Sequence, residues 1–395
     1  MVYTPKEELD NRIKKFQSYL MAKELDGALI IQNADLFYFA GTIQQSHLYI
    51  PSKGLPILMT RRSFCRACVE SALDCIVPLE SWRDIPGLLQ ANGYDLPKRL
   101  GLEMDVLPVN LFLGFREIFP DVEFFDVSFA IRHIRAVKSK FELAALRRAA
   151  KIGERTMQAM HELLNESITE VELAGKLEAV ARAAGHQGFV RFRLWNNELF
   201  YGHLMAGKCA ALTSYVQSPT GGTGLSPGFP QGPSLCKIRR GKPVLFDYVF
   251  ISDGYIVDQT RIFAVGHLPN KLLQAHQATL EIQNTIAEAA KPGTTGDEIY
   301  HLAIKLAKEL GYADNFLGFE KNRITFVGHG VGLELDEYPF LAKGQNMLLE
   351  AGMIIAVEPK VIFPNVGTVG IENTFVVTEH GAKRITLGSD EVAIL

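Results

Sequence analysis

The sequence lacks the features that mark secreted, membrane and nucleic-acid-binding proteins. Basic residues are not in excess, since 41 Lys and Arg stand against 44 Asp and Glu and the formal net charge is −3. Polyanions attract proteins with a clear positive charge, so neither nucleic acid nor an anionic membrane is an expected partner. No uncharged apolar run reaches the roughly 18 residues of a membrane span. The amino-terminal segment MVYTPKEELDNRIKKFQ carries charges where a signal peptide needs an apolar stretch, and we expect a cytoplasmic protein.

Cysteines are few, and their pattern argues against a disulfide framework. The five cysteines are odd in number and scattered, which fits a reducing compartment. Cys65 and Cys68 form a CxxC, but a structural zinc site needs about four ligands, and no second pair or nearby histidine supplies the others. We interpret these two residues as buried thiols on a helix.

Length and patterning predict an α+β protein of two domains. With 395 residues the chain is too long for one ordinary core. Residues 1–135 alternate short helical and strand-like segments, such as the helical RIKKFQSYLMAKEL and the strand-like GALIIQ and PILMT, which favours a small α/β domain. Residues 136–395 begin with longer helices and form a second, larger domain. The basic stretch RHIRAVKSK at residues 132–140 is the expected joint.

The larger region contains clear helix starts. Three S/T-x-x-E patterns, each typical of a helix start, occur at Ser139–Glu142, Thr169–Glu172 and Thr295–Glu298. Gly185 is expected to end the second helix, and a comparable helix pair is expected at about residues 272–291 and 295–311, ending at Gly311. Each pair is followed by strands, so residues 139–395 are expected to form two similar halves.

Two aspartates face each other in a predicted β-hairpin. The segment VLFDYVFISDGYIVDQTRIFAV places two apolar strands around the turn SDG. A turn centred between Ser252 and Asp253 puts Asp247 opposite Asp258, with Cβ atoms about 5 Å apart. Opposed like charges in an apolar hairpin are destabilising unless a cation lies between them or one carboxylate takes a proton. One such pair is as compatible with a structural role as with a cation site.

A second acidic pair strengthens the case for metal. In MIIAVEPKVIFPNVGTVGIENTFVV, a hairpin centred on Asn365 places Glu358 opposite Glu372. Two opposed acidic pairs, each within apolar strands, are harder than a single pair to explain as acidic residues on solvent-exposed strand faces. Four carboxylates neutralise two divalent ions, and this oxygen-rich set suits manganese, cobalt, iron or zinc. We therefore expect two divalent metal ions.

His329 is the candidate nitrogen ligand. It lies in FVGHGVGLELDEYP, where glycines on both sides let the backbone pass close to a site. Alone it is as compatible with a packed histidine as with a ligand, but beside two acidic pairs the ligand role is favoured. Five donors leave room for a bridging water, which two metals acidify into a nucleophile near neutral pH.

Together these motifs resemble the superfamily of methionine aminopeptidase, aminopeptidase P, prolidase and creatinase, whose catalytic domain has the pita-bread fold. LDGALIIQNADLFYFAGT and LGLE resemble the creatinase-type amino-terminal domain, and RAVKSKFELAALRRAA resembles the segment that opens the catalytic domain. The resemblance implies that Asp247 chelates one metal and that Asp258 and Glu372 bridge both. It implies that His329 and Glu358 complete the other, that Glu358 is a candidate proton shuttle, and that the protein is a homodimer.

Two histidines of the peptidase members are missing. No histidine occurs at residues 204–266, where those members place one in the loop before the first metal-binding strand, and Asp336 stands where another follows His329 by seven residues. Such histidines donate hydrogen bonds to the substrate carbonyl and the developing oxyanion, each worth about 3 kcal/mol in comparable sites, and an ionised aspartate cannot donate. Asp336 is instead a candidate to face a cationic substrate, or it turns away and pairs with Arg193 or Arg261.

Two further groups have both functional and structural interpretations. His203 in YGHLMAG is a candidate to replace a lost catalytic histidine, although an isolated histidine is more often structural. Arg191, Arg193 and Trp195 alternate in VRFRLW, which predicts one face of a strand. The two arginines are candidates to bind a substrate carboxylate, or that face lies against solvent or a dimer partner.

We expect a metal-dependent hydrolase in which metal-activated water attacks a small amide or short peptide, by resemblance an enzyme for Xaa-Pro substrates like aminopeptidase P and prolidase. Two alternatives stay open. One is a creatinase-like or lyase-like enzyme acting on a small cationic molecule, since the peptidase histidines are absent. The other is an inactive binding scaffold, against which the complete set of ligands argues.

Manganese or cobalt is expected to raise the melting temperature of metal-free protein, because ions held by opposed carboxylates bind the native state and not the unfolded chain. A hundredfold excess of ion over its dissociation constant adds roughly 2.7 kcal/mol to the free energy of unfolding. Calorimetry of chelator-treated protein with and without manganese measures the shift, with sodium chloride at equal ionic strength as the control. An unchanged melting temperature, with no metal found by elemental analysis, would contradict the expected site.

Overall fold

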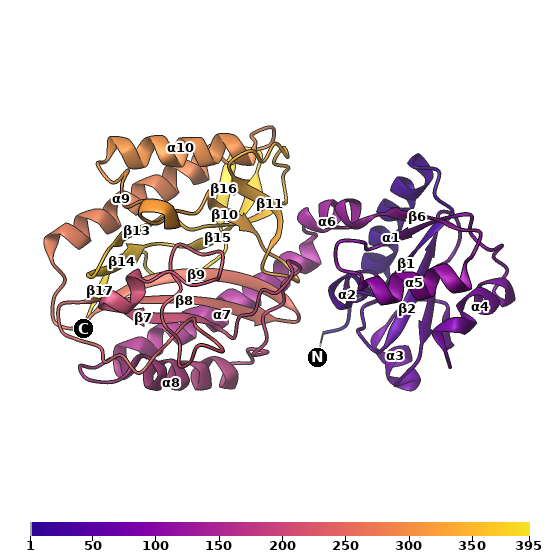
Figure 1. Cartoon of the computed structure of the whole chain (residues 1–395), viewed down its shortest axis with the longest axis horizontal. Coiled ribbons are helices and arrows are strands. Elements are labelled where there is room, and N and C mark those ends of the chain that lie inside the picture. The colour runs from indigo at the N-terminus through magenta and orange to yellow at the C-terminus, as the bar shows by residue number, and fades with distance from the viewer. Residues whose placement is uncertain (1) are drawn as a thin grey trace. The chain divides into compact units, whose positions relative to one another are not determined.

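The computed structural model describes residues 2–395, which form two compact units (Figure 1). One unit ends at Arg135 and the other runs Ala136–Leu395. Each unit buries an apolar core of its own. Within residues 2–395, every helix is too short or too polar to cross a bilayer.

The amino-terminal unit is a six-stranded sheet with helices. Its strands are β1 Gly27–Ile30, β2 Ser46–Pro51, β3 Ile57–Thr60, β4 Ile76–Pro78, β5 Arg99–Leu102 and β6 Glu123–Asp126. Its helices are α1 Lys6–Ala22, α2 Asn33–Ala40, α3 Phe64–Glu70, α4 Ile85–Ala91, α5 Val109–Ile118 and α6 Ser128–Ala136. The sheet order is β4-β3-β2-β1-β5-β6, and Leu29, Met59 and Leu100 belong to the core of this unit. The predicted small α/β domain is confirmed.

The CxxC lies on a helix, as predicted, but its thiols are exposed. α3 has seven residues, of which Ala67 is the buried one. Cys65 and Cys68 lie on the outward side of this short helix. A helix of two turns buries only one narrow stripe of side chains. The prediction of buried thiols is therefore wrong.

Two helix pairs frame the larger unit. They are α7 Lys140–Leu163, α8 Glu170–Ala183, α9 Asn270–Ala289 and α10 Gly296–Glu309. The three predicted capping boxes form, with the hydroxyl of Ser139, Thr169 or Thr295 accepting from the backbone N–H three residues later. Gly185 and Gly311 have positive φ and follow the ends of α8 and α10, as predicted.

The strands of the larger unit lie between these helix pairs. They are β7 Gly202–Ala206, β8 Pro243–Ser252, β9 Tyr255–Ala264, β10 Phe326–Gly330, β11 Glu337–Ala342, β12 Ile354–Val357, β13 Lys360–Phe363, β14 Gly367–Gly370, β15 Asn373–Thr378, β16 Gly381–Arg384 and β17 Ala393–Ile394. One sheet has the order β17-β9-β8-β7, another β11-β10-β12-β15-β16, and β13 pairs with β14. Figure 1 shows α7 and α8 on one side of the sheets and α9 and α10 on the other. Each half is a helix pair followed by strands, as the pita-bread expectation requires.

The first acidic hairpin forms, but its register differs from the predicted one. The turn between β8 and β9 is Asp253–Gly254, both with positive φ, and is centred one residue later than predicted. Asp247 therefore pairs with Thr260, and Asp258 pairs with Val249. The prediction that the aspartates lie directly opposite is wrong. Because strand side chains alternate and each partner moves by two positions, the aspartates still share a face as diagonal neighbours.

The second acidic hairpin has the predicted register. β13 and β14 pair Phe363 with Gly367, so the turn is centred on Asn365, which has positive φ. The same register continues where β12 pairs with β15, in which Val357 lies opposite Asn373. Glu358 and Glu372 fall in the break between these two ladders. They are thus opposite one another at a point where the backbone is free to bend.

Glycines flank His329 where neighbouring strands pass close to β10. A Cβ at Gly328 would lie 2.2 Å from the carbonyl oxygen of Ala356, and one at Gly330 would lie 2.2 Å from that of Tyr338. Side-chain carbons do not approach a carbonyl oxygen so closely, so only glycine fits between these backbones. The glycines therefore let β10 lie close against its two neighbouring strands.

Gly328→Ala is expected to lower the free energy of unfolding by about 2 kcal/mol or more, because the new methyl group must push apart two paired strands. Gly175→Ala is the matched control, since a Cβ at Gly175 in α8 meets no atom within 4 Å. Alanine there is expected to stabilise the helix by about 0.5–1 kcal/mol. Urea unfolding followed by circular dichroism measures both changes. Equal stability of the two variants would show that the passage at Gly328 has room for a side chain.

Candidate metal centre

The five predicted ligands line one cavity of about 100 Å³. They are Asp247 on β8, Asp258 on β9, His329 on β10, Glu358 between β12 and β13, and Glu372 between β14 and β15. The two sheets meet here, because Thr260 and Glu372 form an isolated backbone bridge with N–H to carbonyl distances of 3.2 and 3.4 Å. The cavity therefore lies at the seam between the two halves of the unit.

One side of the cluster is arranged around His329. Its Nε2 atom lies 3.9 Å from Asp258 Oδ2, 3.6 Å from Glu358 Oε1 and 3.9 Å from Glu372 Oε1. Two ligands that each lie about 2.1 Å from one ion are roughly 3.0 to 4.2 Å apart, depending on the angle between them. Asp258, His329 and Glu372 offer ligand atoms that all lie within 4.8 Å of one another, as ligands of a single ion do, and Glu358 Oε1 is the carboxylate oxygen nearest to His329.

The other side of the cluster holds a buried lysine. Lys360 Nζ lies 3.0 Å from Asp247 Oδ2, 2.8 Å from Glu358 Oε2 and 3.1 Å from Glu372 Oε2. Its side chain is 1% exposed. Thr260 Oγ1 also donates to Glu372 Oε2, at 3.0 Å. One ammonium group therefore contacts three of the four carboxylates and offsets one of their negative charges.

The protonation of the cluster reflects this crowding. Burial raises the pKa of Asp258 well above its ordinary value, and neighbouring Asp247 raises it further. Burial and neighbouring Asp258 also raise the pKa of Glu372. Burial alone would lower the pKa of Lys360, but the three carboxylates that it contacts raise it well above its ordinary value. The lysine therefore stays charged, and the cluster as a whole needs more positive charge than the lysine supplies.

The residues present fit a divalent ion on the His329 side. Glu372 Oε1 is buried there and has no hydrogen-bond partner among residues 2–395, which an ion ligand would explain. Three carboxylate oxygens and one imidazole nitrogen suit manganese, cobalt, iron or zinc. The expected second ion does not fit beside the first while Lys360 Nζ is in place. That ammonium contacts the oxygens of Asp247 and Glu372 that a second ion would need.

His203 lines the same cavity. It lies on β7 opposite Asp247 of β8, and its Nε2 lies 3.1 Å from Gln231 Oε1. The amide of Gln231 is oriented by its Nε2, which donates to Glu198 O at 2.7 Å and to Tyr215 Oη at 3.0 Å. Burial lowers the pKa of His203, so its ring is neutral at neutral pH and donates Nε2–H to Gln231.

Asp336 is bound to backbone amides. Its Oδ1 accepts from Arg193 N at 2.8 Å, and its Oδ2 accepts from Leu194 N at 2.7 Å. The alternative in which it pairs with Arg261 is wrong, because the Arg261 guanidinium donates to Glu372 O, at 2.9 Å, and is buried elsewhere. The pairing with Arg193 occurs, through its backbone N–H. The Asp336 carboxylate therefore anchors a loop, and it lines the adjoining pocket, which also contains His329 and Glu358.

The segment around Arg193 is a loop and not the predicted strand. The Arg193 side chain is 2% exposed, with Nη1 3.8 Å from Glu334 Oε2. Trp195 is 93% exposed, so the three alternating residues do not share one environment. The carbonyl of Arg191 accepts from Leu335 N at 2.8 Å. Neither arginine lines the cavity, so the structure does not bring these two predicted substrate-binding residues to the cluster.

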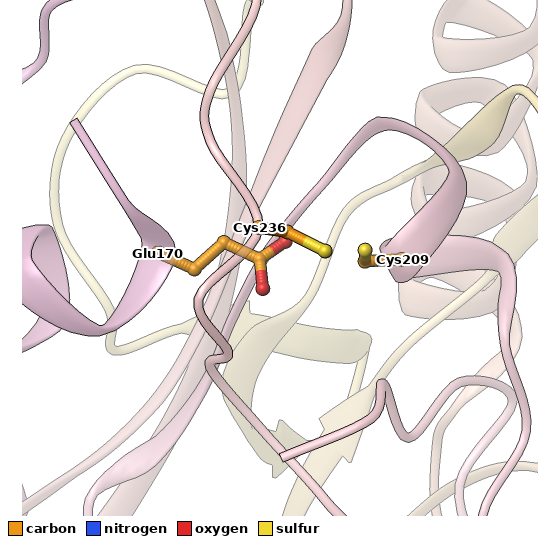
Figure 2. Close-up of side chains that lie close together, drawn as sticks. All are labelled: Glu170, Cys209 and Cys236. Atoms are coloured by element: carbon orange, nitrogen blue, oxygen red, sulfur yellow. The ribbon is translucent and has the colours of Figure 1, made fainter. Parts of the chain in front are cut away.

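A second group of possible metal ligands lies outside this cavity. Figure 2 shows Glu170, Cys209 and Cys236 close together, with ligand atoms within 4.8 Å of one another. Both Glu170 oxygens are already engaged, Oε1 by Ala206 N at 2.7 Å and Oε2 by the hydroxyl of Ser234 at 2.6 Å. Burial raises the pKa of Cys209 to about 12, so its side chain is a neutral thiol in the metal-free protein. The hydrogen bonds of Glu170 join α8 to the neighbouring segments at Ala206 and Ser234.

Lys360 is the functional residue that the sequence interpretation missed. A signal was present, because Lys360 follows Glu358 by two residues and such side chains point to the same face of an extended segment. A lysine in the apolar segment VEPKVIF is as unusual as a carboxylate there. Gln231 gave no comparable signal, since its contact with His203 depends on the path of a long loop.

Comparison with known proteins gives one consistent result. Residues 144–379 match the model of metallopeptidase family M24, and residues 12–137 match the creatinase/prolidase N-terminal domain. The Xaa-Pro dipeptidase of Pyrococcus furiosus is 28% identical over 96% of this chain and 98% of its own length. That of Lactobacillus delbrueckii subsp. lactis is 27% identical over 97% and 98%. The solved Xaa-Pro dipeptidase from Bacillus anthracis, 26% identical, superimposes with a TM-score of 0.81 over 98% of this chain and 100% of its own.

Asp336→Asn is expected to lower the free energy of unfolding by about 1–3 kcal/mol, because the amide offers one acceptor oxygen to two backbone N–H groups. It is expected to change the affinity for cationic and neutral ligands equally. Urea unfolding, and calorimetric titration with a quaternary ammonium compound and a neutral amide, measure the two effects. Asp314→Asn, at an exposed position of the same unit, is the control. Loss of cation affinity alone would show that Asp336 faces the substrate.

Proposed function

Since the chain belongs to metallopeptidase family M24, we propose that it is a metal-dependent hydrolase of Xaa-Pro dipeptides or similarly small amides. The observation that carries this proposal is the gathering of all five ligand residues in one small cavity. The cavity and the adjoining pocket, which share His329 and Glu358, form a concave site of the kind that binds small molecules. Relatives named Xaa-Pro dipeptidase that match nearly the whole chain support the substrate class.

The family implies divalent metal ions, and the donor set suits manganese, cobalt, iron or zinc. When bound, such an ion lowers the pKa of its water to about 7 and polarises a carbonyl oxygen. Glu358 Oε1 lies on the ion-binding side of the cluster, and we assign to this carboxylate the transfer of a proton to the leaving amine. His203 makes the hydrogen bond to a substrate oxygen, in exchange for its present one to Gln231. Asp336 has no part in this chemistry, because both its oxygens hold backbone amides.

A small cationic substrate is the second candidate. The observation that favours it is the charge of the cavity wall, which includes Glu198 beside the four carboxylates of the cluster. The basic side chains that line the cavity, among residues 2–395, are His203, His329 and Lys360, and Lys360 is held by three carboxylates. An exposed lysine, Lys343, lines the adjoining pocket and is a possible partner for a substrate carboxylate.

An inactive scaffold is the least supported alternative, because a protein that does not use a metal has no need of all five ligand residues.

A homodimer and a cytoplasmic location stay predictions. Exposed apolar side chains of the larger unit support self-association, because Phe189, Trp195, Phe200 and Leu235 are all more than half exposed.

Protein reconstituted with manganese is expected to hydrolyse Xaa-Pro dipeptides, and Asp258→Ala or Glu372→Ala is expected to lower kcat/KM more than the roughly 10- to 100-fold typical of outer-sphere variants. Each change removes a carboxylate that is assigned as a direct ligand of the metal, so the remaining ligands no longer complete the coordination of the ion. Release of proline, measured with and without chelator, reports the activity. Asp95→Ala, at an exposed position of the amino-terminal unit, is the control.

Longer proline peptides and small guanidino or betaine compounds, tested in the same assay, decide between the two substrate classes. Turnover of the cationic compounds without turnover of dipeptides would favour the second candidate. Near-normal turnover by either ligand variant at saturating manganese would show that the ligand assignment is wrong.

A further inference from the structure

Lys360 is built into the metal centre by the fold. It is the first residue of β13, two positions after Glu358, and it lies opposite Gly370 of β14. A Cβ at Gly370 would lie 2.7 Å from Lys360 Cγ, so the lysine stem occupies space that only a glycine leaves open. The side chain is 1% exposed and its ammonium ends among the carboxylates. A solvated surface lysine has none of these features.

The cluster divides its oxygens between two cationic positions. Glu358 and Glu372 each direct Oε2 to Lys360 Nζ, at 2.8 and 3.1 Å. Each directs Oε1 to the side of His329 Nε2, at 3.6 and 3.9 Å. The two glutamates thus bridge the lysine position and the histidine position, as carboxylates bridge two ions in a two-metal site.

The aspartates follow the same division. Asp247 Oδ2 contacts Lys360 Nζ at 3.0 Å, whereas Asp258 Oδ2 faces His329 Nε2 at 3.9 Å. Asp258, His329 and Glu372 each offer a ligand atom within 4.8 Å of the others. Asp247 therefore pairs with the lysine, whereas Asp258 is available to bind an ion.

Charge supports one ion and not two. Four carboxylates with one ammonium and one divalent ion leave a single negative charge, which a buried site tolerates when it is hydrogen-bonded. A second divalent ion bound through the same oxygens would lie next to the ammonium, and like charges so close repel strongly in a site shielded from water. A second ion would therefore have to expel a lysine that the surrounding fold encloses.

We propose that this chain binds a single divalent ion, at Asp258, His329, Glu358 and Glu372, and that the ammonium of Lys360 permanently occupies the position of a second cation. The inference rests on the proposed metal-dependent function and specifies its centre. The lysine neutralises charge and orients Asp247 and the two glutamates, but it provides no coordination position for a water or a substrate oxygen. Only the ion on the His329 side does so.

The number and coupling of bound ions test the proposal. Chelator-treated full-length protein is reconstituted with manganese, freed of excess ion and analysed by elemental analysis and electron paramagnetic resonance. The unaltered protein is expected to retain about one ion per chain, with the six-line spectrum of isolated manganese(II), since two-metal sites place their ions only about 3.5–4 Å apart and couple their spins.

Lys360→Ala removes the ammonium and opens its position, so this variant is expected to retain about two manganese ions per chain and to show a spin-coupled spectrum. Lys343→Ala, which changes an exposed lysine of the adjoining pocket, is the matched control and is expected to retain about one. If Lys360→Ala fails to fold, the count and spectrum of the unaltered protein still decide.

Two coupled ions in the unaltered protein would overturn the inference while leaving the proposed function intact, provided that the protein hydrolyses Xaa-Pro dipeptides. One ion in both the unaltered protein and folded Lys360→Ala would also overturn it, because the lysine would then not be what excludes the second ion. Failure to bind any manganese, zinc, cobalt or iron would overturn the inference together with the metal-dependent function.

Discussion

The mutual repulsion of four buried carboxylates is the constraint on which the larger unit depends. Asp247, Asp258, Glu358 and Glu372 line one cavity, and like charges held so close together repel one another. Such a cluster persists only where rigid elements hold its members and cations compensate them. The hairpin of β8 and β9, the bent hairpin from β12 to β15, and the glycine-flanked β10 supply the rigid frame. The ammonium of Lys360 supplies the first compensating charge.

Local features were predictable from the sequence because they depend on neighbouring residues alone. The capping box at Ser139 requires only the residue three positions later, and it forms as predicted. The hairpin centred on Asn365 was also placed correctly. The hairpin carrying Asp247 was misplaced because the sequence SDG allows two turn centres, and only the chain geometry selects the one at Asp253–Gly254. The prediction that Asp247 and Asp258 share a face was still correct, because strand side chains alternate and a change of two positions in the register keeps both on the same side.

Contacts between distant segments were not predictable in the same way. Lys360 meets Asp247 across 113 positions of sequence, and Asp336 meets the backbone of Arg193 across 143. No local pattern encodes such a partner, so the sequence left open whether Asp336 faces a substrate or turns away to pair with Arg193 or Arg261, and the fold shows its contact with the Arg193 backbone. The same limitation led to Arg193 being assigned to the substrate, although the fold buries it beside Glu334.

The seam between the halves has a consequence for how the protein matures. The first half supplies Asp247 and Asp258, the second supplies His329, Glu358 and Glu372, and the bridge between Thr260 and Glu372 joins them. A chain emerging from the ribosome therefore has no complete centre until its last strands have docked against strands made more than a hundred residues earlier. Capture of metal can only follow tertiary assembly, so metal retention distinguishes finished molecules from partly folded ones during biosynthesis.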